Sequence, residues 1–549
     1  MRPADERPAP DGLAAGTPSA VGSGGGPGSA SDSGGFGQAL IAGLQAAGTR
    51  EVLVRGARRL TGEQVHASAQ ALAARLADEG VRPGDTVAGL YGPHLESPIS
   101  RVAAYLLDCR YVYLLARMPL DAVETAVRRL RPAVLLVDPS RQRQAEVLQA
   151  ADAGIHCVHL DPGVFATRRT GPSSLPERRT RGAPEQIASV LFTSGTTGEP
   201  KSIAYSNRSE LAQFATAMAV LGPPPWRFLA PPAAFVPSLM AQWAMATGGT
   251  AVLPEQDDAA SMAGLIRRER VRQCTIGLPQ DLLAFADHLA AARPDLGELE
   301  LLVYGGASVP PARVASLARR LPGRLRQIYG TSEAAMIATL SPSDHQRGEL
   351  LGSVGRPVPR TQVTVCDPDG RPLPPGRVGP LWVRSAQNMD GYLDGETGTL
   401  SMSDGLPGPA PPNVPDQADA SARRGPEWLP TGDAAYLDRD GYLFLVGRLV
   451  DRLPSGAYPQ PIENALDEHP AVAEAAVCAL PDGTTAALVV PRPGHSIDLP
   501  ALRTHLDASH PSHTHPQHLR LTDTLPRTPN GKLDRRALAE HFAKSGPSG

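Results

Sequence analysis

A loop rich in glycine and hydroxyl side chains follows a short apolar run in the first half of the chain. The run spans residues 188–192, and the loop reads TSGTTGEPK over residues 193–201. Gly195 and Gly198 free backbone N–H groups, and Lys201 adds a positive charge. Four hydroxyl groups complete the donor set, those of Thr193, Ser194, Thr196 and Thr197. Such a loop behind a strand can wrap the oxygens of a polyphosphate, and we expect it to do so.

Four more polar motifs follow at intervals along the chain. The first loop is not a Walker phosphate loop, because no Gly-Lys-Ser/Thr follows a four-residue spacer. A turn between two strands would have the same composition, so the loop alone leaves both interpretations open. The four later motifs are YGTSE (329–333), PTGD (430–433), GYLFLVGR (441–448) and LPRTPNGKLDRRAL (525–538).

In this order and with these separations, the five motifs resemble those of the adenylate-forming superfamily. That superfamily contains acyl- and aryl-CoA ligases, peptide-synthetase adenylation domains and luciferases. The resemblance covers the chain from about Phe36 to about Phe542. It is specific for the superfamily, and it carries little information about the substrate.

The resemblance implies a nucleotide site built from separate parts of the chain. The 193–201 loop would hold the β- and γ-phosphates of ATP. Tyr329 would stack on the adenine, and Asp433 and Arg448 would contact the ribose hydroxyls. The YGGA segment (304–307) would lie along the adenine, which assigns nucleotide contacts to Gly305, Gly306 and Ala307.

Three further residues would take part in the chemistry. By the same resemblance, Ser332 would touch the α-phosphate, Glu333 would bind Mg²⁺, and Lys532 would bridge the substrate carboxylate and the α-phosphate. A carboxylate is a suitable ligand for so hard a cation. Attack of a carboxylate on the α-phosphate brings two anions together, and Mg²⁺ and a mobile lysine neutralise the developing charge. A core aromatic, a helix cap and a solvated tail lysine are the plainer interpretations of Tyr329, Asp433 and Lys532, and the shared motif order argues against them.

Helical and strand-like segments alternate through most of the sequence. Residues 62–80 carry apolar side chains at spacings of three and four and end at Gly80, which predicts an amphipathic helix. Short apolar runs predict buried strands at 85–91, 131–138, 249–255, 272–279 and 300–308. This alternation indicates an α/β fold with parallel sheets covered by helices.

We predict three parts in the chain. Residues 1–35 have no apolar core of a signal peptide and are expected to be a disordered leader. Residues 36–447 are expected to form a large N-terminal adenylation domain, in which the low-complexity segment 403–427 is a flexible insert. Residues 448–549 are expected to form a small mobile α+β domain that carries Lys532.

Several positions depart from the pattern of the superfamily. Val450 stands where the family's hinge usually has Asp or Lys, and Asp451 offers a carboxylate one place later. The segment 453–466 is shortened before Tyr458, and Pro461 replaces an expected Glu. In the superfamily this segment helps to form the tunnel for the thiol. The changes therefore leave the adenylation step untouched and weaken the expectation of ordinary CoA thioester formation.

The acyl pocket also departs from the pattern of the superfamily. Phe235 stands where many relatives carry a histidine or an aromatic residue near the carboxylate, and it is our candidate for the pocket wall. Trp243 and Met245 follow nearby and are equally compatible with plain core. A histidine cluster (510–518) and an arginine-rich stretch (177–182) are expected to be solvated loops, not a metal site or an RNA patch.

Composition limits the remaining possibilities. The net charge is −3 at pH 7, which argues against nucleic acid as a partner. The five cysteines are scattered without a CxxC pair, as is typical of reduced thiols. No apolar run reaches the roughly 18 residues that predict a membrane helix. A cytoplasmic protein without a membrane partner is expected.

The leading hypothesis is an ATP- and Mg²⁺-dependent ligase that adenylates a small carboxylic acid. It would pass the acyl group to the thiol of CoA or of a separate acyl or peptidyl carrier protein, in a specialised pathway such as antibiotic biosynthesis. One alternative is an ATP-dependent diazotase that activates nitrite for an aryl amine. Another is a non-catalytic nucleotide-binding relative, against which Lys201, Glu333, Asp433 and Lys532 argue.

Overall fold

A computed structural model describes most of the chain from residue 35 onward. It describes residues 35–549 except 92–93, 115–117, 153, 161–181, 195–199, 223, 225, 232–234, 257, 396, 403–426, 493, 510, 529–531 and 545–549. The side chains of residues 193–194, 200, 235–237, 509 and 544 are also outside the description. The predicted leader and the predicted insert thus lie outside the described residues, apart from the last residue of each.

The larger of two main sheets has nine strands, and its six central strands, from β13 to β1, pair in parallel. The first strand of the chain, β1, pairs with β10, so that Leu53 lies opposite Ala251. In spatial order the sheet contains β15 (Arg356–Pro357), β14 (Ala335–Leu340), β13 (Leu325–Thr331), β12 (Leu301–Gly305), β11 (Gln273–Ile276), β9 (Arg227–Leu229), β10 (Thr250–Val252), β1 (Glu51–Arg55) and β2 (Arg58–Thr61).

The second main sheet has eight strands, of which the five from β7 to β6 pair in parallel. Its other three strands are antiparallel. In spatial order it contains β19 (Leu400–Ser401), β18 (Gly391–Leu393), β8 (Pro200–Ser206), β7 (Ile187–Ser194), β4 (Arg110–Leu114), β3 (Thr86–Leu90), β5 (Val134–Val137) and β6 (Cys157–His159).

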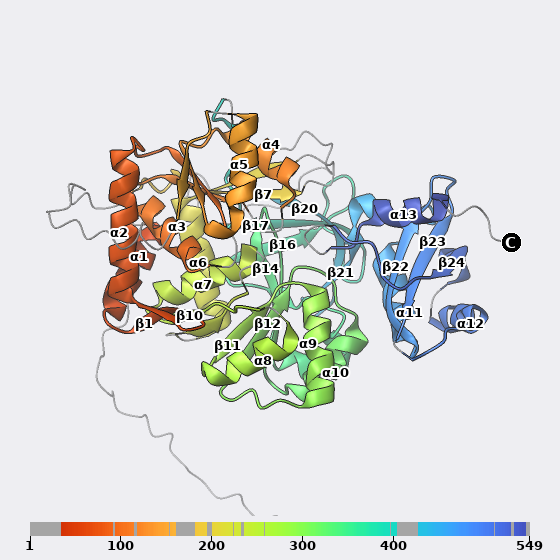
Figure 1. Ribbon diagram of the computed structural model, residues 1–549. Helices are drawn as coiled ribbons and strands as arrows, with labels where there is room; N and C mark the ends of the chain where they lie inside the picture. Colours follow the sequence, from red (N-terminus) through yellow and green to blue (C-terminus); the bar gives the residue numbers. More distant parts are fainter. Residues whose placement is uncertain are drawn as a thin grey trace, which may run out of the picture. The chain divides into compact units, whose positions relative to one another are not determined.

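Helices cover both faces of each main sheet, and one helical layer is shared between them (Figure 1). The shared layer contains α1 (Phe36–Ala47), α2 (Gly62–Asp78), α3 (Glu96–Leu106), α6 (Asn207–Leu221) and α7 (Phe235–Ala246). The outer faces are covered by α4 (Leu120–Leu130) and α5 (Gln142–Ala151) on the eight-stranded sheet, and by α8 (Ala259–Arg268), α9 (Pro279–Ala292) and α10 (Pro311–Arg320) on the nine-stranded sheet.

The strand sequences explain this layering, because successive side chains of a strand point to opposite faces. In β5, Leu136 packs in the shared core, whereas its neighbours Leu135 and Val137 pack in the outer one. Strands buried on both faces need continuous apolar runs, which is the pattern that the sequence shows. The predicted α/β fold with parallel sheets is confirmed.

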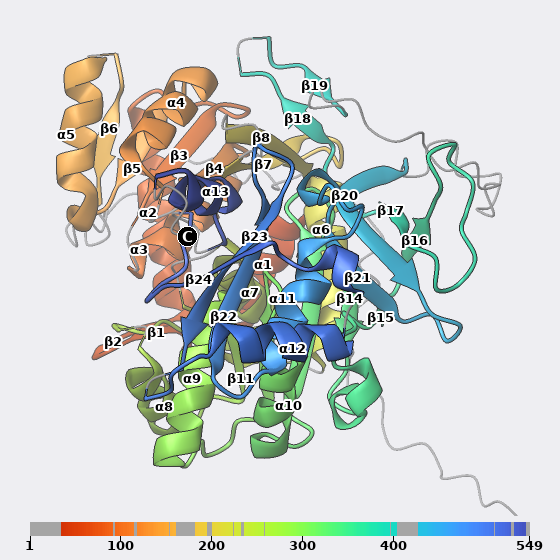
Figure 2. The same cartoon turned by 90° about the vertical axis from the view of Figure 1, so that its right-hand side faces the viewer.

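Two smaller sheets follow along the chain. The first is antiparallel and contains β16 (Thr361–Val365), β17 (Gly379–Ser385), β20 (Leu429–Leu437) and β21 (Leu443–Arg448). The second contains β22 (Val472–Ala479), β23 (Thr485–Pro491) and β24 (His518–Leu521), together with α11 (Pro459–Glu468), α12 (Leu499–Ser509) and α13 (Arg535–Lys544) (Figure 2). In β22, Val477 packs with α11 and α12, while the adjacent Ala476 and Cys478 pack with α13.

The local predictions agree with these elements. The helix predicted over 62–80 is α2, which begins behind a capping box formed by Thr61 and Gln64. It ends at Asp78 because Gly80 takes a φ of +93°, in the left-handed region that favours glycine. All five cysteines are unpaired. Within the described residues, we find no helix with the length and hydropathy needed to cross a membrane.

Candidate active site

The hydroxyl-rich loop connects two antiparallel strands. β7 is buried over its apolar part and continues to Ser194, and β8 begins at Pro200, with Thr193 opposite Lys201. Cross-strand pairing therefore extends into the predicted loop from both ends. Its central residues, Gly195, Thr196, Thr197 and Gly198, lie outside the described residues, as do the side chains of Thr193 and Ser194.

Lys201 is the described cation of this loop. Its Nζ lies 5.4 Å from the centroid of the Tyr392 ring, so the ammonium group faces an aromatic side chain. The hydroxyl group of Tyr392 donates a hydrogen bond of 3.2 Å to Oε1 of Glu333. One tyrosine thus connects the predicted phosphate loop with the predicted metal ligand.

Ser332 and Glu333 lie in the tight turn between β13 and β14. Gly330 permits this turn, because a Cβ atom there would lie 1.8 Å from the carbonyl oxygen of Ala335. The turn is held from the eight-stranded sheet. The Tyr205 hydroxyl group donates to the Ser332 carbonyl oxygen, and the Met389 N–H donates to the Glu333 carbonyl oxygen at 2.7 Å.

Asp433 on β20 lies directly opposite Arg448 on β21, with 3.4 Å between Asp433 Oδ1 and Arg448 Nε. Its other oxygen accepts a hydrogen bond of 2.5 Å from the Tyr329 hydroxyl group. Gly432 supplies the backbone bend before Asp433 with a φ of +74°. Burial raises the pKa of Asp433 above its ordinary value, although Arg448, Tyr329 and Lys532 act in the opposite direction and Glu333 adds to the increase.

The YGGA segment (304–307), which is predicted to lie along the adenine, begins at the end of β12, and β12 pairs with β13. Gly305 pairs with Ile328, the residue before Tyr329. Gly306 has a φ of +87°, and a Cβ atom there would lie 2.5 Å from the carbonyl oxygen of Gly277. Ala307 follows in the loop that leads to α10.

Lys532 lies in the loop that leads from β24 to α13, far along the chain from the other site residues. The residue is exposed to solvent, yet neighbouring protein crowds its ammonium group. This burial is the main cause of a lowered pKa for Lys532, with the charge of Arg448 second, while Asp433 and Glu333 partly offset both. The four charged groups therefore lie close enough to interact.

The structure thus brings most of the predicted residues together. Lys201, Glu333, Asp433, Arg448 and Lys532 belong to one charged cluster, and Tyr329 contacts it directly. Gly305, Gly306 and Ala307 flank the strand that carries Tyr329. Phe235 begins α7, but its side chain lies outside the described residues, so its place in an acyl pocket stays a prediction.

Three residues that sequence reasoning missed help to build the site. Tyr392 contacts Glu333 and Lys201, Tyr205 holds the Ser332 turn, and Asp390 accepts a hydrogen bond of 2.7 Å from the Ser206 N–H. Asp390 and Tyr392, together with Met389, come from the segment NMDGYL (388–393). The mixture of polar, glycine and aromatic residues in this segment could have marked it as part of a site.

The departures from the superfamily pattern are visible as well. Val450 is 70% exposed, whereas Asp451 forms an ion pair of 3.2 Å with Arg535. Pro461 lies in the first turn of α11. Gln460, next to it, donates a hydrogen bond of 2.7 Å to the Ser308 hydroxyl group, in the loop after β12.

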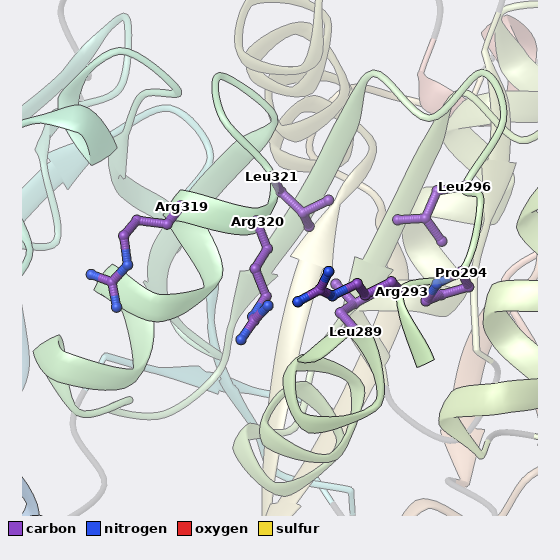
Figure 3. A pocket seen from close by; sticks show the side chains of 7 residues that line it. All are labelled: Leu289, Arg293, Pro294, Leu296, Arg319, Arg320 and Leu321. Carbon is purple, nitrogen blue, oxygen red and sulfur yellow. The ribbon is translucent and has the colours of Figure 1, made fainter. Parts of the chain in front are cut away.

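Two other features lie outside the charged cluster. A hollow of about 320 Å³ at the C-terminal ends of α9 and α10 contains none of the predicted site residues (Figure 3). In the histidine cluster, His515 lies 3.3 Å from Asp507 and His518 lies on β24. Across the described part of the chain, no group of three His, Cys, Asp or Glu side chains is arranged to hold a metal ion.

Comparison with known families identifies the class of protein. A family model described as "AMP-binding enzyme" matches residues 43–393, and one described as "AMP-binding enzyme C-terminal domain" matches residues 461–532. The first match covers more than half of the chain. The chain therefore belongs to the AMP-binding enzyme family, whose members are adenylate-forming enzymes.

Individual relatives differ in what they act on. The amide bond synthetase McbA of Marinactinospora thermotolerans is 32% identical, with a TM-score of 0.80 over 92% of this chain and 99% of that one. The fatty acid–[acyl-carrier-protein] ligase ScoC of Streptomyces coeruleorubidus is 29% identical over 90% of this chain and 93% of its own length. The medium/long-chain fatty acid–CoA ligase FadD8 of Mycobacterium tuberculosis is 29% identical over 65% of this chain, which spans 62% of that relative.

Proposed function

We propose that this protein adenylates a carboxylic acid with ATP, releases pyrophosphate, and passes the acyl group to the thiol of CoA or of a separate carrier protein. The observation that supports the adenylation step is the convergence of Lys532 with Asp433, Glu333 and Arg448. A lysine crowded among these groups is suited to meet the anionic oxygens of an acid and a phosphate.

The donor set fits a magnesium–nucleotide complex. Asp433 offers buried carboxylate oxygens that can accept from ribose hydroxyl groups, and Glu333 offers the oxygen ligands that Mg²⁺ prefers. Lys201 and Lys532 supply positive charge for phosphate oxygens. Bound Mg²⁺ would supply the further charge that offsets the negative charge on the transferred phosphate oxygens.

The chain's own residues would mainly orient the reacting groups and neutralise their negative charge. Tyr392 would hold the Glu333 carboxylate, and Tyr205 would fix the turn that presents Ser332. Lys532 would donate hydrogen bonds to the attacking carboxylate and to an α-phosphate oxygen, which lowers the repulsion between the two anions. Positioning and charge account for the whole step, since no covalent enzyme intermediate is required.

A second candidate keeps adenylation and uses an amine as the acceptor. It is favoured by the 32% identity to an amide bond synthetase over nearly the full length of both chains. The shortened segment before Tyr458 and the hinge at Val450 point the same way, because an amine needs no thiol tunnel. A variant of this candidate activates nitrite in place of the acid and passes it to an aryl amine.

A pyrophosphate-release screen separates these candidates. Aliphatic, aryl and amino acids and nitrite are tested alone, with CoA, with a phosphopantetheinylated carrier protein and with aryl and alkyl amines, and products are identified by mass spectrometry. The Lys532→Ala variant is the control. A thioester would support the first candidate and an amide the second. Unchanged pyrophosphate exchange in Lys532→Ala would contradict the adenylation mechanism.

A further inference from the structure

Two short segments meet beside the charged cluster, and one arginine joins them. The first segment, 448–451, contains the end of β21 and the 3-10 turn η4 (Leu449–Asp451). The second, 532–535, leads into α13. Arg448 precedes Asp451 by three positions, and Lys532 precedes Arg535 by three. The bond between Asp451 and Arg535 joins the last residues of the two segments, and the charge of Arg448 acts on Lys532 at their first residues.

Arg535 makes that bond while all three nitrogens of its guanidinium group donate hydrogen bonds. Its Nε lies 3.2 Å from Asp451 Oδ2, and its two terminal nitrogens lie 2.6 and 3.2 Å from the two carboxylate oxygens of Glu463 on α11. It also donates to the carbonyl oxygen of Val477. Because the fork of the guanidinium group is rigid, these acceptors fix the direction of the side chain as well as its position.

The ion pairs are partly shielded from solvent. The side chains of Arg535 and Asp451 are 23% and 26% exposed, and that of Glu463 is 10% exposed. Paired charges at this exposure are screened less than those at the surface, where such pairs contribute little. Glu463 is also held by the Val477 N–H at 2.8 Å, so the side chain that orients Arg535 is itself fixed.

The loop that carries Lys532 is closed mainly by its own bonds. The Thr528 N–H donates to the Lys532 carbonyl oxygen at 2.8 Å, and the Asp534 N–H donates to the Pro526 carbonyl oxygen at 3.0 Å. These bonds shape the loop, and an ion pair of 2.7 Å between Arg527 and Glu474 connects it to β22. The pair of Asp451 with Arg535 connects the end of the loop directly to the segment that follows β21.

We propose that Asp451 and Arg535 are a positioning pair that holds Lys532 at its working distance from Asp433 and Arg448. This proposal rests on the adenylation function proposed above. It also gives a purpose to the carboxylate one place after Val450: it fixes the lysine-bearing loop, while the exposed Val450 makes no such bond in the described structure.

The test uses the full-length enzyme and three single variants. Asp451→Asn removes one charge and leaves the bonds between Arg535 and Glu463 in place, so the fold should be retained. Arg535→Lys keeps a charge and loses the fork. Glu79→Gln is the matched control, because Glu79, directly after α2, has the same side-chain exposure as Asp451 (26%) and forms an ion pair of 2.8 Å with Arg75.

Two measurements are made on each variant. In pyrophosphate release, Asp451→Asn should lower kcat about tenfold or more, with little change in KM for ATP, and Arg535→Lys should give an intermediate loss. In the second, the pH dependence of Lys532 labelling by an amine-reactive reagent is followed by peptide mass spectrometry. Its midpoint should rise toward the ordinary lysine pKa in Asp451→Asn, because the ammonium group leaves its crowded position. Glu79→Gln should match the wild type in both.

The outcomes are decisive for the pair. An unchanged labelling midpoint in Asp451→Asn, or equal losses in Glu79→Gln, would overturn the proposal. The labelling experiment needs no substrate, so it still decides the role of the pair if no acid supports pyrophosphate release. That last result would contradict the proposed function alone.

Discussion

Replacing Asp433 by Asn should weaken ATP binding without lowering the stability of the fold. The variant keeps the shape of the side chain and removes one negative charge from a residue that is 7% exposed. If the carboxylate accepts hydrogen bonds from the ribose, Asn retains one acceptor and loses one charge-assisted bond. Such a bond contributes about 1.5–3 kcal/mol, so KM for ATP should rise roughly 10- to 150-fold, with a smaller effect on kcat.

The stability of the same variant should not fall. The pKa of Asp433 is raised in the folded state, chiefly by burial, so the folded protein binds this proton more tightly than the unfolded chain does. Stability linked to this group is therefore greatest at low pH and decreases as the pH rises through the raised pKa. Above the raised pKa the ionised carboxylate is a cost that Asn removes, and the amide oxygen can still accept from Tyr329.

Thermal unfolding and steady-state pyrophosphate release at pH 7 test both parts. We expect a Tm no lower than that of the wild type together with weakened ATP use. Asp138→Asn is the control, since Asp138 is likewise a buried carboxylate but lies outside the charged cluster, and it should leave KM for ATP unchanged. A lower Tm with an unaltered KM would show that Asp433 is a structural residue and would refute the reasoning.

Three further predictions concern neighbouring residues. Because the pKa of Lys532 is lowered, chiefly by burial, kcat/KM for ATP should begin to decline at a pH below the ordinary lysine pKa. The Lys532→Arg variant should lack that alkaline decline. Identical pH profiles of the two enzymes would contradict the assignment of Lys532. Tyr392→Phe removes the hydrogen-bond donor to Glu333, so the Mg²⁺ concentration that gives half the maximal rate should rise about 2- to 10-fold. An unchanged Mg²⁺ titration would show that Tyr392 does not orient Glu333 for Mg²⁺. Gln460→Ala removes the hydrogen bond to Ser308. It should lower the adenylation rate about 2- to 10-fold in a single-turnover assay without altering Tm. A loss confined to acyl transfer would argue against a role of this bond in adenylation.

Much of the fold could be predicted because its signals are local. The apolar runs of β3, β5, β10, β11 and β12 are readable in the sequence, since strands buried on both faces contain few polar residues. The pairing of β1 with β10 was not readable, because a short strand carries no mark of a partner some 200 residues away. The same limit explains why the shared helical layer emerges only from the structure.

In the candidate site too, some residues could be predicted from the sequence and others could not. Lys201, Glu333, Asp433, Arg448 and Lys532 were accessible because each belongs to a motif whose order along the chain is itself informative. Tyr205 and Tyr392 were not, since a tyrosine in a strand is ordinarily core and nothing in its neighbours reveals a contact across two sheets. Their bonds depend on the approach of two distant segments.

The position of β1 within the nine-stranded sheet has a consequence for synthesis of the protein. Leu53 cannot find its partner Ala251 until the intervening chain has left the ribosome. At about 5–20 residues per second, this interval lasts on the order of 10–40 seconds. During that time β1, with the buried residues Val52, Leu53 and Val54, has no parallel neighbour in its sheet. The nascent chain should therefore depend on chaperones early, and shortened chains that end before β10 should aggregate.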